Sequence, residues 1–348
     1  MKKRIMGVLL AAICAIGLIG CGNTNNSGTS TKKEDTTKAS YIVRIGMPTA
    51  GKHFQNFTAE QYKETIEKAT NGDIIVEIYP SSQLGTATQM IQGVQDGSIE
   101  GVMIPSSYFC SFAPASAVTD IPFFFEDSQQ IFDILNTPDN PLNVYLEKYG
   151  FKVAAWFKNT PRYILSQKKY ESIADMKNQK IWCLPSRTLQ KELNAYAASP
   201  QTLDPSDISV SLENGTVDGV ETDVLFMNST GLGASAKYLN KIPNTPMTNL
   251  FCFGKDWFDK LPKDYQELLI NTANDIIRTQ EIPYVEKQYN GSLQALQDLG
   301  VEIVEPNDAL ITELKEKSES VTDSFINESE ENSEIYHELS EMILNYTK

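Results

Sequence analysis

The sequence predicts an α/β protein made of two similar lobes, and three observations support that prediction. Segments with strand and helix patterns alternate along the chain, which is typical of largely parallel sheets covered by helices. A short junction sequence occurs twice, 118 residues apart. The part that follows the first 40 residues is long enough for two domains with a sizeable core.

Apolar spacing places the main elements. Residues 41–46 (YIVRIG) and 74–79 (IIVEIY) have the composition of strands, and between them apolar residues recur near helical spacing from Phe57 to Ala69. The run 262–277 is an amphipathic helix. The remaining strand candidates are 152–156, 180–184, 250–253 and 301–304.

The repeated junction favours two lobes built on the same plan. Residues 95–102 read QDGSIEGV and residues 213–220 read ENGTVDGV. In each copy a glycine, Gly97 or Gly215, follows a helix-like stretch where a left-handed cap is needed, and a short strand comes next. Two such lobes with the chain crossing between them enclose a cleft, and clefts between domains are where small ligands bind.

The first 40 residues carry an export signal and a linker. Lys2-Lys3-Arg4 precedes an apolar run at 5–20, which is shorter than the roughly 20 residues of a spanning helix. The run ends in Leu-Ile-Gly-Cys21, which resembles the lipobox of bacterial lipoproteins. We therefore expect a lipoprotein signal peptide at 1–20 and acylation of Cys21; a secreted protein with a chance cysteine is the alternative. Residues 21–40 should form a flexible tether, because 23–40 contain no large apolar residue.

Charge and residue usage exclude several function classes. Loss of residues 1–20 removes three basic residues and no acidic ones, so the formal charge of −15 becomes −18. Such an acidic chain is a poor binder of nucleic acid. Cys110, Cys183 and Cys252 are an odd, widely spaced set that fits neither a disulfide framework nor a zinc site, and two histidines are too few for a histidine-rich metal site. Because nucleophile-elbow, P-loop and dinucleotide motifs are also missing from the sequence, we expect no cofactor and no enzymatic activity.

Eight short motifs follow one another along residues 41–305. They are TNGDIIVEIYPSSQLG at 70–85, GSIEGVMIPSSY at 97–108, DIPFFFED at 120–127, WFKNTPRYI at 156–164, DMKNQKIW at 175–182, LENGTVDGVET at 212–222, DWFDKLP at 256–262 and LGVEIVE at 299–305. Their order and approximate spacing resemble those of the DctP-type substrate-binding proteins of tripartite ATP-independent periplasmic (TRAP) transporters.

The resemblance implies a periplasmic-binding-protein-like clamshell with a long helix spanning both lobes. By analogy, lobe one is 41–159 plus 248–287, and lobe two is 160–247 plus 288–348. It also implies an extracytoplasmic protein, here with a lipid anchor in the membrane. Such a protein captures a small organic acid and delivers it to the permease subunits of a transporter driven by an ion gradient.

In the family, two arginines and an asparagine of the second lobe are associated with the ligand carboxylate. The first arginine position is Arg162, at the end of WFKNTPR. The second belongs to a Lys-Ile-Arg segment that reads Lys-Ile-Trp182 here, and the asparagine position holds Thr222. One basic anchor is therefore present, one is replaced by an indole, and the amide is replaced by a hydroxyl. The alternatives are a surface salt bridge for Arg162 and a core position for Trp182, because a one-residue slip reverses the faces of a strand.

Three residues of the first lobe are further candidates for ligand contact. Ser106 and Tyr108 follow the strand after the first junction, and His53 lies in the first loop between strand and helix. An ordinary loop contact is the alternative for Ser106 and Tyr108, and an exposed loop position is the alternative for His53.

The indole at position 182 decides the expected ligand. An indole cannot neutralise a carboxylate, but it offers a broad apolar face for stacking and one N–H donor. We therefore expect a monocarboxylate with an apolar or aromatic end. The alternative is a binding protein of the same fold for an uncharged or aromatic ligand, serving an ABC importer or a sensor. A surface enzyme and a lipoprotein adhesin are the other classes considered.

Overall fold

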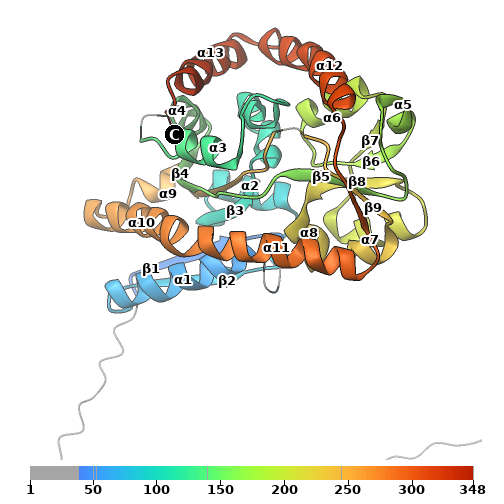
Figure 1. The fold of residues 1–348 in the computed structure, drawn as a ribbon. Helices are drawn as coiled ribbons and strands as arrows, with labels where there is room; N and C mark the ends of the chain where they lie inside the picture. Colours follow the sequence, from blue (N-terminus) through green and yellow to red (C-terminus); the bar gives the residue numbers. More distant parts are fainter. Residues whose placement is uncertain (1–38, 50, 52, 139, 244, 348) are drawn as a thin grey trace, which may run out of the picture. The chain divides into compact units, whose positions relative to one another are not determined.

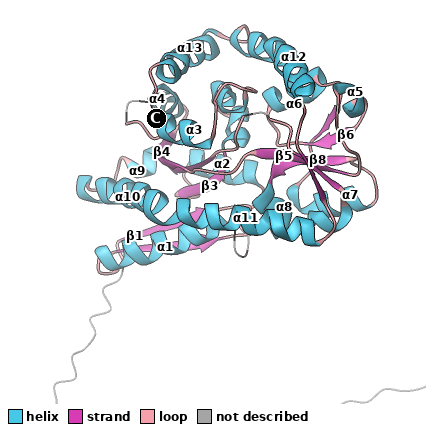
Figure 2. Cartoon of the chain, in the orientation of Figure 1, coloured by secondary structure: helices cyan, strands magenta, loops and turns pink. Residues whose placement is uncertain are grey.

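The strands form two separate sheets in the computed structural model, which describes residues 39–49, 51, 53–138, 140–243 and 245–347 (Figures 1 and 2). The first sheet has the order β2-β1-β3-β10-β4, and the second has the order β11-β9-β5-β8-β6-β7. The strands of the first sheet are β1 Tyr41–Gly46, β2 Ile74–Tyr79, β3 Gly101–Pro105, β4 Phe151–Trp156 and β10 Asn249–Gly254. Those of the second are β5 Arg162–Ser166, β6 Lys180–Trp182, β7 Ser199–Gln201, β8 Gly219–Asp223, β9 Tyr238–Asn240 and β11 Glu302–Val304.

Both sheets are mixed, which corrects the prediction of largely parallel sheets. Strand β1 pairs in parallel with β2 and β3, and β6 pairs in parallel with β7 and β8. In contrast, β10 runs antiparallel to β3 and β4, and β5 runs antiparallel to β8 and β9. Each of these two strands comes directly from the other sheet, β5 after β4 and β10 after β9. Each of them therefore starts at the edge of the sheet where its neighbouring strands end, and so it runs antiparallel to them. A parallel strand would first need a long connection back to the opposite edge.

The two junctions form as predicted. Helix α2 (Ala87–Asp96) ends at Gly97, whose φ of 79° is left-handed, and the chain then enters β3. Helix α7 (Ile208–Glu213) is followed by Gly215, with a φ of 75°, and by β8. A left-handed backbone costs a glycine little because it has no Cβ atom. Equivalent turns therefore lead into β3 of the first sheet and into β8 of the second sheet.

A long helical segment runs along both sheets, as the resemblance implies (Figure 1). It consists of α10 (Lys263–Ile276), the π-helical turn η5 (Ile277–Glu281) and α11 (Ile282–Asp298). Helix α10 packs on α1 (Phe54–Ala69) and on β4 of the first sheet. Helix α11 packs on α8 (Val224–Ser229), which follows β8 of the second sheet. The fold is therefore a two-lobed α/β clamshell.

Two C-terminal helices, α12 (Asp308–Ile326) and α13 (Glu330–Leu344), arch over the side of the molecule that lies opposite the long helical segment (Figure 1). Helix α12 packs on α6 and α5, whereas α13 packs on η2, α3 and α4. The chain therefore returns to elements near the first sheet, although the expected second lobe includes α13; the lobe boundaries stay a prediction. The remaining helices are η1 Ser106–Ser111, η2 Pro114–Asp120, α3 Ser128–Leu135, α4 Pro141–Lys148, α5 Ile173–Met176, α6 Arg187–Ala195, η3 Pro205–Asp207, η4 Leu232–Ser235 and α9 Lys255–Phe258.

Within the described part of the chain, none of the helices combines the length and the apolar character needed to cross a bilayer. The three cysteines of this part, Cys110, Cys183 and Cys252, are free thiols. The predicted signal peptide, Cys21 and nearly all of the predicted tether lie outside the described residues.

Candidate ligand-binding site

A small cavity lies at the carboxyl ends of the parallel strands and takes its lining from both sheets. About 390 Å³ of space free of protein atoms lies there, counting space open to solvent. In open α/β sheets this edge is where ligands bind, because loops of several strands converge there. The lining residues are Pro48, Thr49, His53, Gln55, Pro105, Tyr108, Trp182, Leu184, Pro205, Thr222, Asp223, Phe226, Met247 and Asn249.

Four of the six residues expected at the ligand site line this cavity together. They are His53, Tyr108, Trp182 and Thr222. The other two, Arg162 and Ser106, are not in the lining. Ser106 is buried, and its hydroxyl lies 3.0 Å from the Thr119 hydroxyl and 3.3 Å from the Thr248 carbonyl oxygen. These contacts hold the loop that carries Tyr108.

Trp182 is both buried and part of the cavity wall. Its side chain is only 1% exposed, and its indole nitrogen donates a 3.0 Å hydrogen bond to the Leu203 carbonyl oxygen. The single N–H donor of the indole is therefore used within the protein. What the ring presents to the cavity is apolar surface, which suits stacking rather than hydrogen bonding.

His53 and Tyr108 contribute uncharged polar groups. His53 caps α1, because its Nδ1 accepts the N–H of Gln55 at 3.4 Å. Burial lowers the pKa of His53 to about 3, so the ring is neutral, and an accepting Nδ1 leaves the proton on Nε2. Burial, together with the nearby charge of Asp204, raises the pKa of Tyr108, so its hydroxyl stays protonated.

Arg162 lies in a buried cluster of charges rather than in the lining. Its side chain is 1% exposed; Nη1 donates to Asp120 Oδ1 at 2.9 Å, and Nε lies 3.5 Å from Glu221 Oε1. Glu192 of α6 also interacts with the guanidinium, and the nearby carboxylates raise the pKa of Arg162 against the effect of its burial. Nη2 makes no hydrogen bond within the described structure. Nε, although close to Glu221, also makes no hydrogen bond there, so both nitrogens keep unused donors.

The strand register shows how Arg162 lies relative to the cavity. In the β5–β8 ladder, Arg162 is opposite Asp223 and Tyr163 is opposite Thr222. In the β6–β8 pair, Trp182 matches Val220, two residues before Thr222. Because successive side chains alternate between faces, Trp182 and Thr222 belong to one face of the sheet, and Arg162 belongs to the other. The ladder partner Asp223 lines the cavity, whereas Arg162 itself does not.

Sequence reasoning missed Asp223 and Asn249, two polar residues of the lining. Asp223 is 1% exposed, and its Oδ1 accepts the N–H groups of Leu225 and Phe226 at 3.0 Å each, which caps α8. Asn249 opens β10 and accepts a hydrogen bond from Asn159 at 3.1 Å. A signal for Asp223 did exist: the 118-residue spacing of the two junctions, continued three residues past the repeated segments, aligns it with Pro105, which also lines the cavity.

The electrostatics of the lining are unusual for an acid-binding site. Lys and Arg are absent from the lining residues in the described structure, and Asp223 is the one carboxyl group among them. Burial raises the pKa of Asp223 to about 6, although its backbone hydrogen bonds favour the ionised form. The lining therefore combines apolar rings with neutral donors and a single acid.

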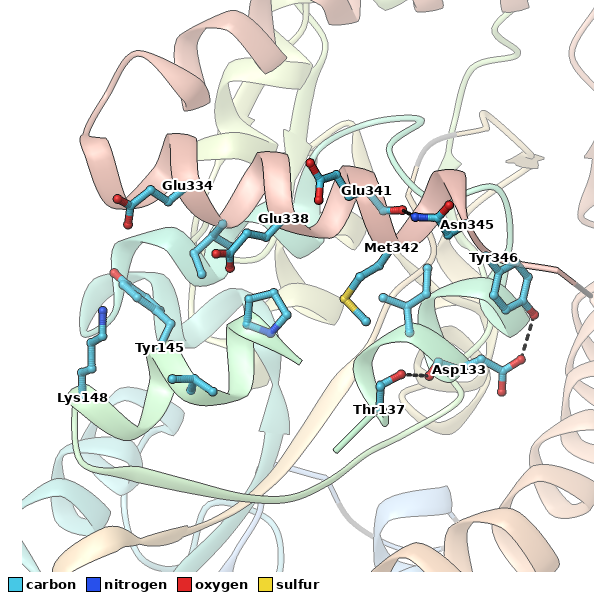
Figure 3. Close-up of a pocket in the computed structure, with 14 residues that line it drawn as sticks. Asp133, Thr137, Tyr145, Lys148, Glu334, Glu338, Glu341, Met342, Asn345 and Tyr346 are labelled. Atoms are coloured by element: carbon cyan, nitrogen blue, oxygen red, sulfur yellow. Dashed lines mark hydrogen bonds between the residues drawn. The ribbon is translucent and has the colours of Figure 1, made fainter. Parts of the chain in front are cut away.

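A larger groove lies between α13 and the helices α3 and α4 (Figure 3). Glu334, Glu338 and Glu341 project from α13 on one side, and Asp133 and Lys148 lie on the other (Figure 3). Four carboxylates against one ammonium group repel an anion, and the groove is more open to solvent than the cavity between the sheets. It is therefore a poor candidate for an organic acid.

A cavity between two α/β lobes, with a helix along both of them, defines a solute-binding protein of the clamshell class. The chain belongs to the bacterial extracellular solute-binding proteins of family 7 (DctP), whose family model matches residues 45–329. This family binds solutes for TRAP-type transport outside the cytoplasm and is not a family of enzymes. The predicted family, fold class and absence of enzymatic activity are confirmed.

Several named proteins are similar to this chain. The 2,3-diketo-L-gulonate-binding periplasmic protein YiaO of Escherichia coli is 26% identical over 268 residues, which cover 76% of this chain and 81% of that protein. The C4-dicarboxylate-binding periplasmic protein DctP of Rhodobacter capsulatus is 25% identical over 251 residues, covering 70% and 73%. A TRAP periplasmic solute binding protein from Desulfovibrio salexigens, solved with bound orotic acid, is 25% identical with a TM-score of 0.81, covering 87% of this chain and 99% of its own.

Proposed function

We propose that this protein captures a small monocarboxylate with a planar apolar or aromatic end and delivers it to the permease subunits of a TRAP transporter. The observation that carries the proposal is the cavity wall formed by Trp182, Tyr108 and Phe226, with Arg162 directly opposite Asp223 in the β5–β8 ladder. Aromatic rings favour a flat ligand that stacks on them. One guanidinium suits one carboxylate, because a planar fork of donors grips two oxygens at once.

Two further observations support this ligand class. Nη2 of Arg162 is a buried donor without a partner in the described structure, and a ligand carboxylate that reached it would satisfy it. The Desulfovibrio salexigens relative was solved with orotic acid, a planar ring that bears one carboxylate. In both respects a flat monoanion fits better than a dicarboxylate, which needs a second cation.

An uncharged ligand is the second candidate, because the lining presents Asp223 and no Lys or Arg among the described residues. A binding protein for such a ligand could serve an ABC importer or a sensor. Under this alternative the ion pair of Arg162 with Asp120 only joins η2 to the second sheet, and the ligand meets His53, Thr222 and Asn249 through neutral hydrogen bonds.

Thermal unfolding in the presence of benzoate, orotate, uracil and succinate separates these candidates. A ligand present at about 100 times its dissociation constant adds about 2.7 kcal/mol of stability. We expect benzoate and orotate to raise the unfolding temperature, and uracil and succinate to have little effect. Stabilisation by uracil but by neither acid would favour the uncharged ligand, and stabilisation by succinate alone would contradict both.

Closure of the lobes is part of the proposal, with lobe one as 41–159 plus 248–287 and lobe two as 160–247 plus 288–348. A ligand shifts a hinge equilibrium through contacts that exist only in the closed state. Small-angle scattering should therefore show a smaller radius of gyration with a stabilising acid than without it. An unchanged radius would contradict closure, and product formed on long incubation would point to an enzyme.

We also propose that the mature chain begins at an acylated Cys21 and is anchored to the membrane through a tether at 21–40. The Leu-Ile-Gly-Cys motif and the polar tether support this proposal. Changing Cys21 to Ser should leave the signal uncleaved or release the protein from membranes, because the substituted chain lacks the thiol to be acylated. Fractionation and mass measurement of the protein test this, and unchanged size with unchanged membrane retention would refute it.

A further inference from the structure

We propose that Asp223 is a specificity-determining residue that selects acids bearing an O–H or N–H donor remote from their carboxylate and rejects acids with a second negative charge there. The inference rests on the proposed function, since it concerns the same cavity. It assigns the far end of the ligand to Asp223, whereas the proposed function concerns the end that carries the carboxylate.

The position of Asp223 is the first argument. It is the last residue of β8, it is 1% exposed, and it lines the cavity together with Trp182, Thr222 and Phe226. The equivalent residue of the other junction, Pro105, lines the cavity from the first sheet. A ligand enclosed between these two strand ends must therefore contact Asp223 or lie next to it.

The chemistry of a buried carboxylate is the second argument. An ionised carboxylate only accepts hydrogen bonds and has about four lone-pair positions. Oδ1 of Asp223 already accepts two N–H groups of α8, and the Asn159 side chain also hydrogen-bonds to this carboxylate. Three donors leave about one of the four lone-pair positions for a donor of the ligand. A second anion at this end would meet Asp223 in a cavity that places no cation in its described lining, and like charges there are poorly screened.

The neighbours of Asp223 complete the expected pattern. Asn249 uses its carbonyl oxygen to accept from Asn159, so its amide nitrogen remains as a donor, and the Thr222 hydroxyl lies in the same lining. The matching ligand has a hydrogen-bond donor that faces Asp223 and, next to it, an acceptor that faces Asn249 or Thr222. A ring hydroxyl or a cyclic amide has this pattern. The structure therefore points to hydroxylated aromatic acids and N–H-bearing heterocyclic acids.

Three acids that share one ring and one carboxylate test the inference: benzoate, 4-hydroxybenzoate and terephthalate. Calorimetric titration gives their dissociation constants for the wild type and for Asp223→Asn. A hydrogen bond to a charged acceptor favours 4-hydroxybenzoate over benzoate by about tenfold or more, and the second carboxylate should make terephthalate the weakest of the three. In Asp223→Asn the hydroxyl preference should fall to within about threefold, and terephthalate should gain at least tenfold.

The substitution keeps the fold, because Asn and Asp cap helices equally well. Asp127→Asn is the matched control, since Asp127 caps α3 through two backbone N–H groups and is absent from the cavity lining. It should leave all three affinities unchanged. If Asp223→Asn does not fold, Asp223→Ser replaces it, because Ser also caps and also lacks the charge.

The outcomes separate the two proposals. Failure of the wild type to bind any of the three acids contradicts the proposed monocarboxylate. In that case the affinities for phenol and fluorobenzene test the inference on uncharged rings: the wild type should prefer phenol, and Asp223→Asn should not. An unchanged hydroxyl preference in Asp223→Asn overturns the inference even when benzoate binds. Binding of none of the five probes overturns both.

Discussion

Replacing Arg162 by Met should destabilise the fold and weaken acid binding, and the two effects can be measured apart. Arg162 is buried, with one carboxylate at 2.9 Å, a second at 3.5 Å and a third, Glu192, close enough to affect its pKa. Removing the only guanidinium of this cluster leaves buried acids without their cation. Breaking a buried ion pair in this way costs about 3–5 kcal/mol, although a hydrophobic replacement of the whole pair can be neutral.

Urea unfolding followed by far-ultraviolet circular dichroism measures the first effect. Arg187→Met is the matched control, because its side chain is 76% exposed and its 2.8 Å ion pair with Glu328 should contribute at most about 1 kcal/mol. We expect the free energy of unfolding to fall by about 3–5 kcal/mol in Arg162→Met and by less than about 1 kcal/mol in the control. Equal losses in the two variants would refute the view that Arg162 is held by buried carboxylates.

Titration of benzoate into folded Arg162→Met measures the second effect. If Arg162 anchors the ligand carboxylate, its loss costs about 2–5 kcal/mol of binding free energy, which is roughly 30-fold to several thousand-fold in affinity. Binding within about threefold of the wild type would show that the arginine is structural only. A large loss of stability with unchanged binding is therefore the signature of a purely structural role, and loss of both is the signature of an anchor.

Two further predictions concern other buried side chains. Trp182→Phe should weaken benzoate binding by about 0.5–1.5 kcal/mol and remove most of the ligand-induced change in fluorescence, because the indole lines the cavity. Trp182→Arg should gain affinity for succinate. If Trp182→Phe binds benzoate normally and keeps the fluorescence change, the indole belongs to the core only. Glu281 is 0% exposed, neither of its carboxyl oxygens has a hydrogen-bond partner among the described residues, and burial raises its pKa well above the ordinary value. The folded state therefore retains this proton where the unfolded state has lost it, so wild-type stability should fall as the pH rises above about 4.5, and Glu281→Gln should remove that part of the fall. Urea unfolding at pH 5 and pH 8 checks this, with the exposed Glu286→Gln as control; parallel pH profiles for wild type and Glu281→Gln would contradict it.

Local patterns were enough to predict most of the fold. The strands at 41–46 and 74–79 form with the predicted bounds, and the helix predicted at 262–277 forms at 263–276. These elements depend on the periodicity of neighbouring side chains, which is written in consecutive residues. The mixed sheets were missed because the direction of β5 and β10 depends on which sheet the chain arrives from, and no local pattern encodes that.

Part of the site could likewise be predicted from the sequence, and part could not. The sequence by itself, through the order of its motifs and their resemblance to the family, predicted that Trp182 and Thr222 would face a cleft between the lobes, with His53 and Tyr108 as further candidates; all four line one cavity. Only the tertiary structure decided that Arg162 belongs to the opposite face of the sheet, paired with Asp120, and that Asp223 reaches the cavity. The partner of a buried charge is chosen by long-range packing, since Asp120 lies 42 residues away from Arg162 in the chain. Which carboxylate pairs with Arg162 depends on which groups are removed from water together. That is a property of the assembled fold rather than of any one segment.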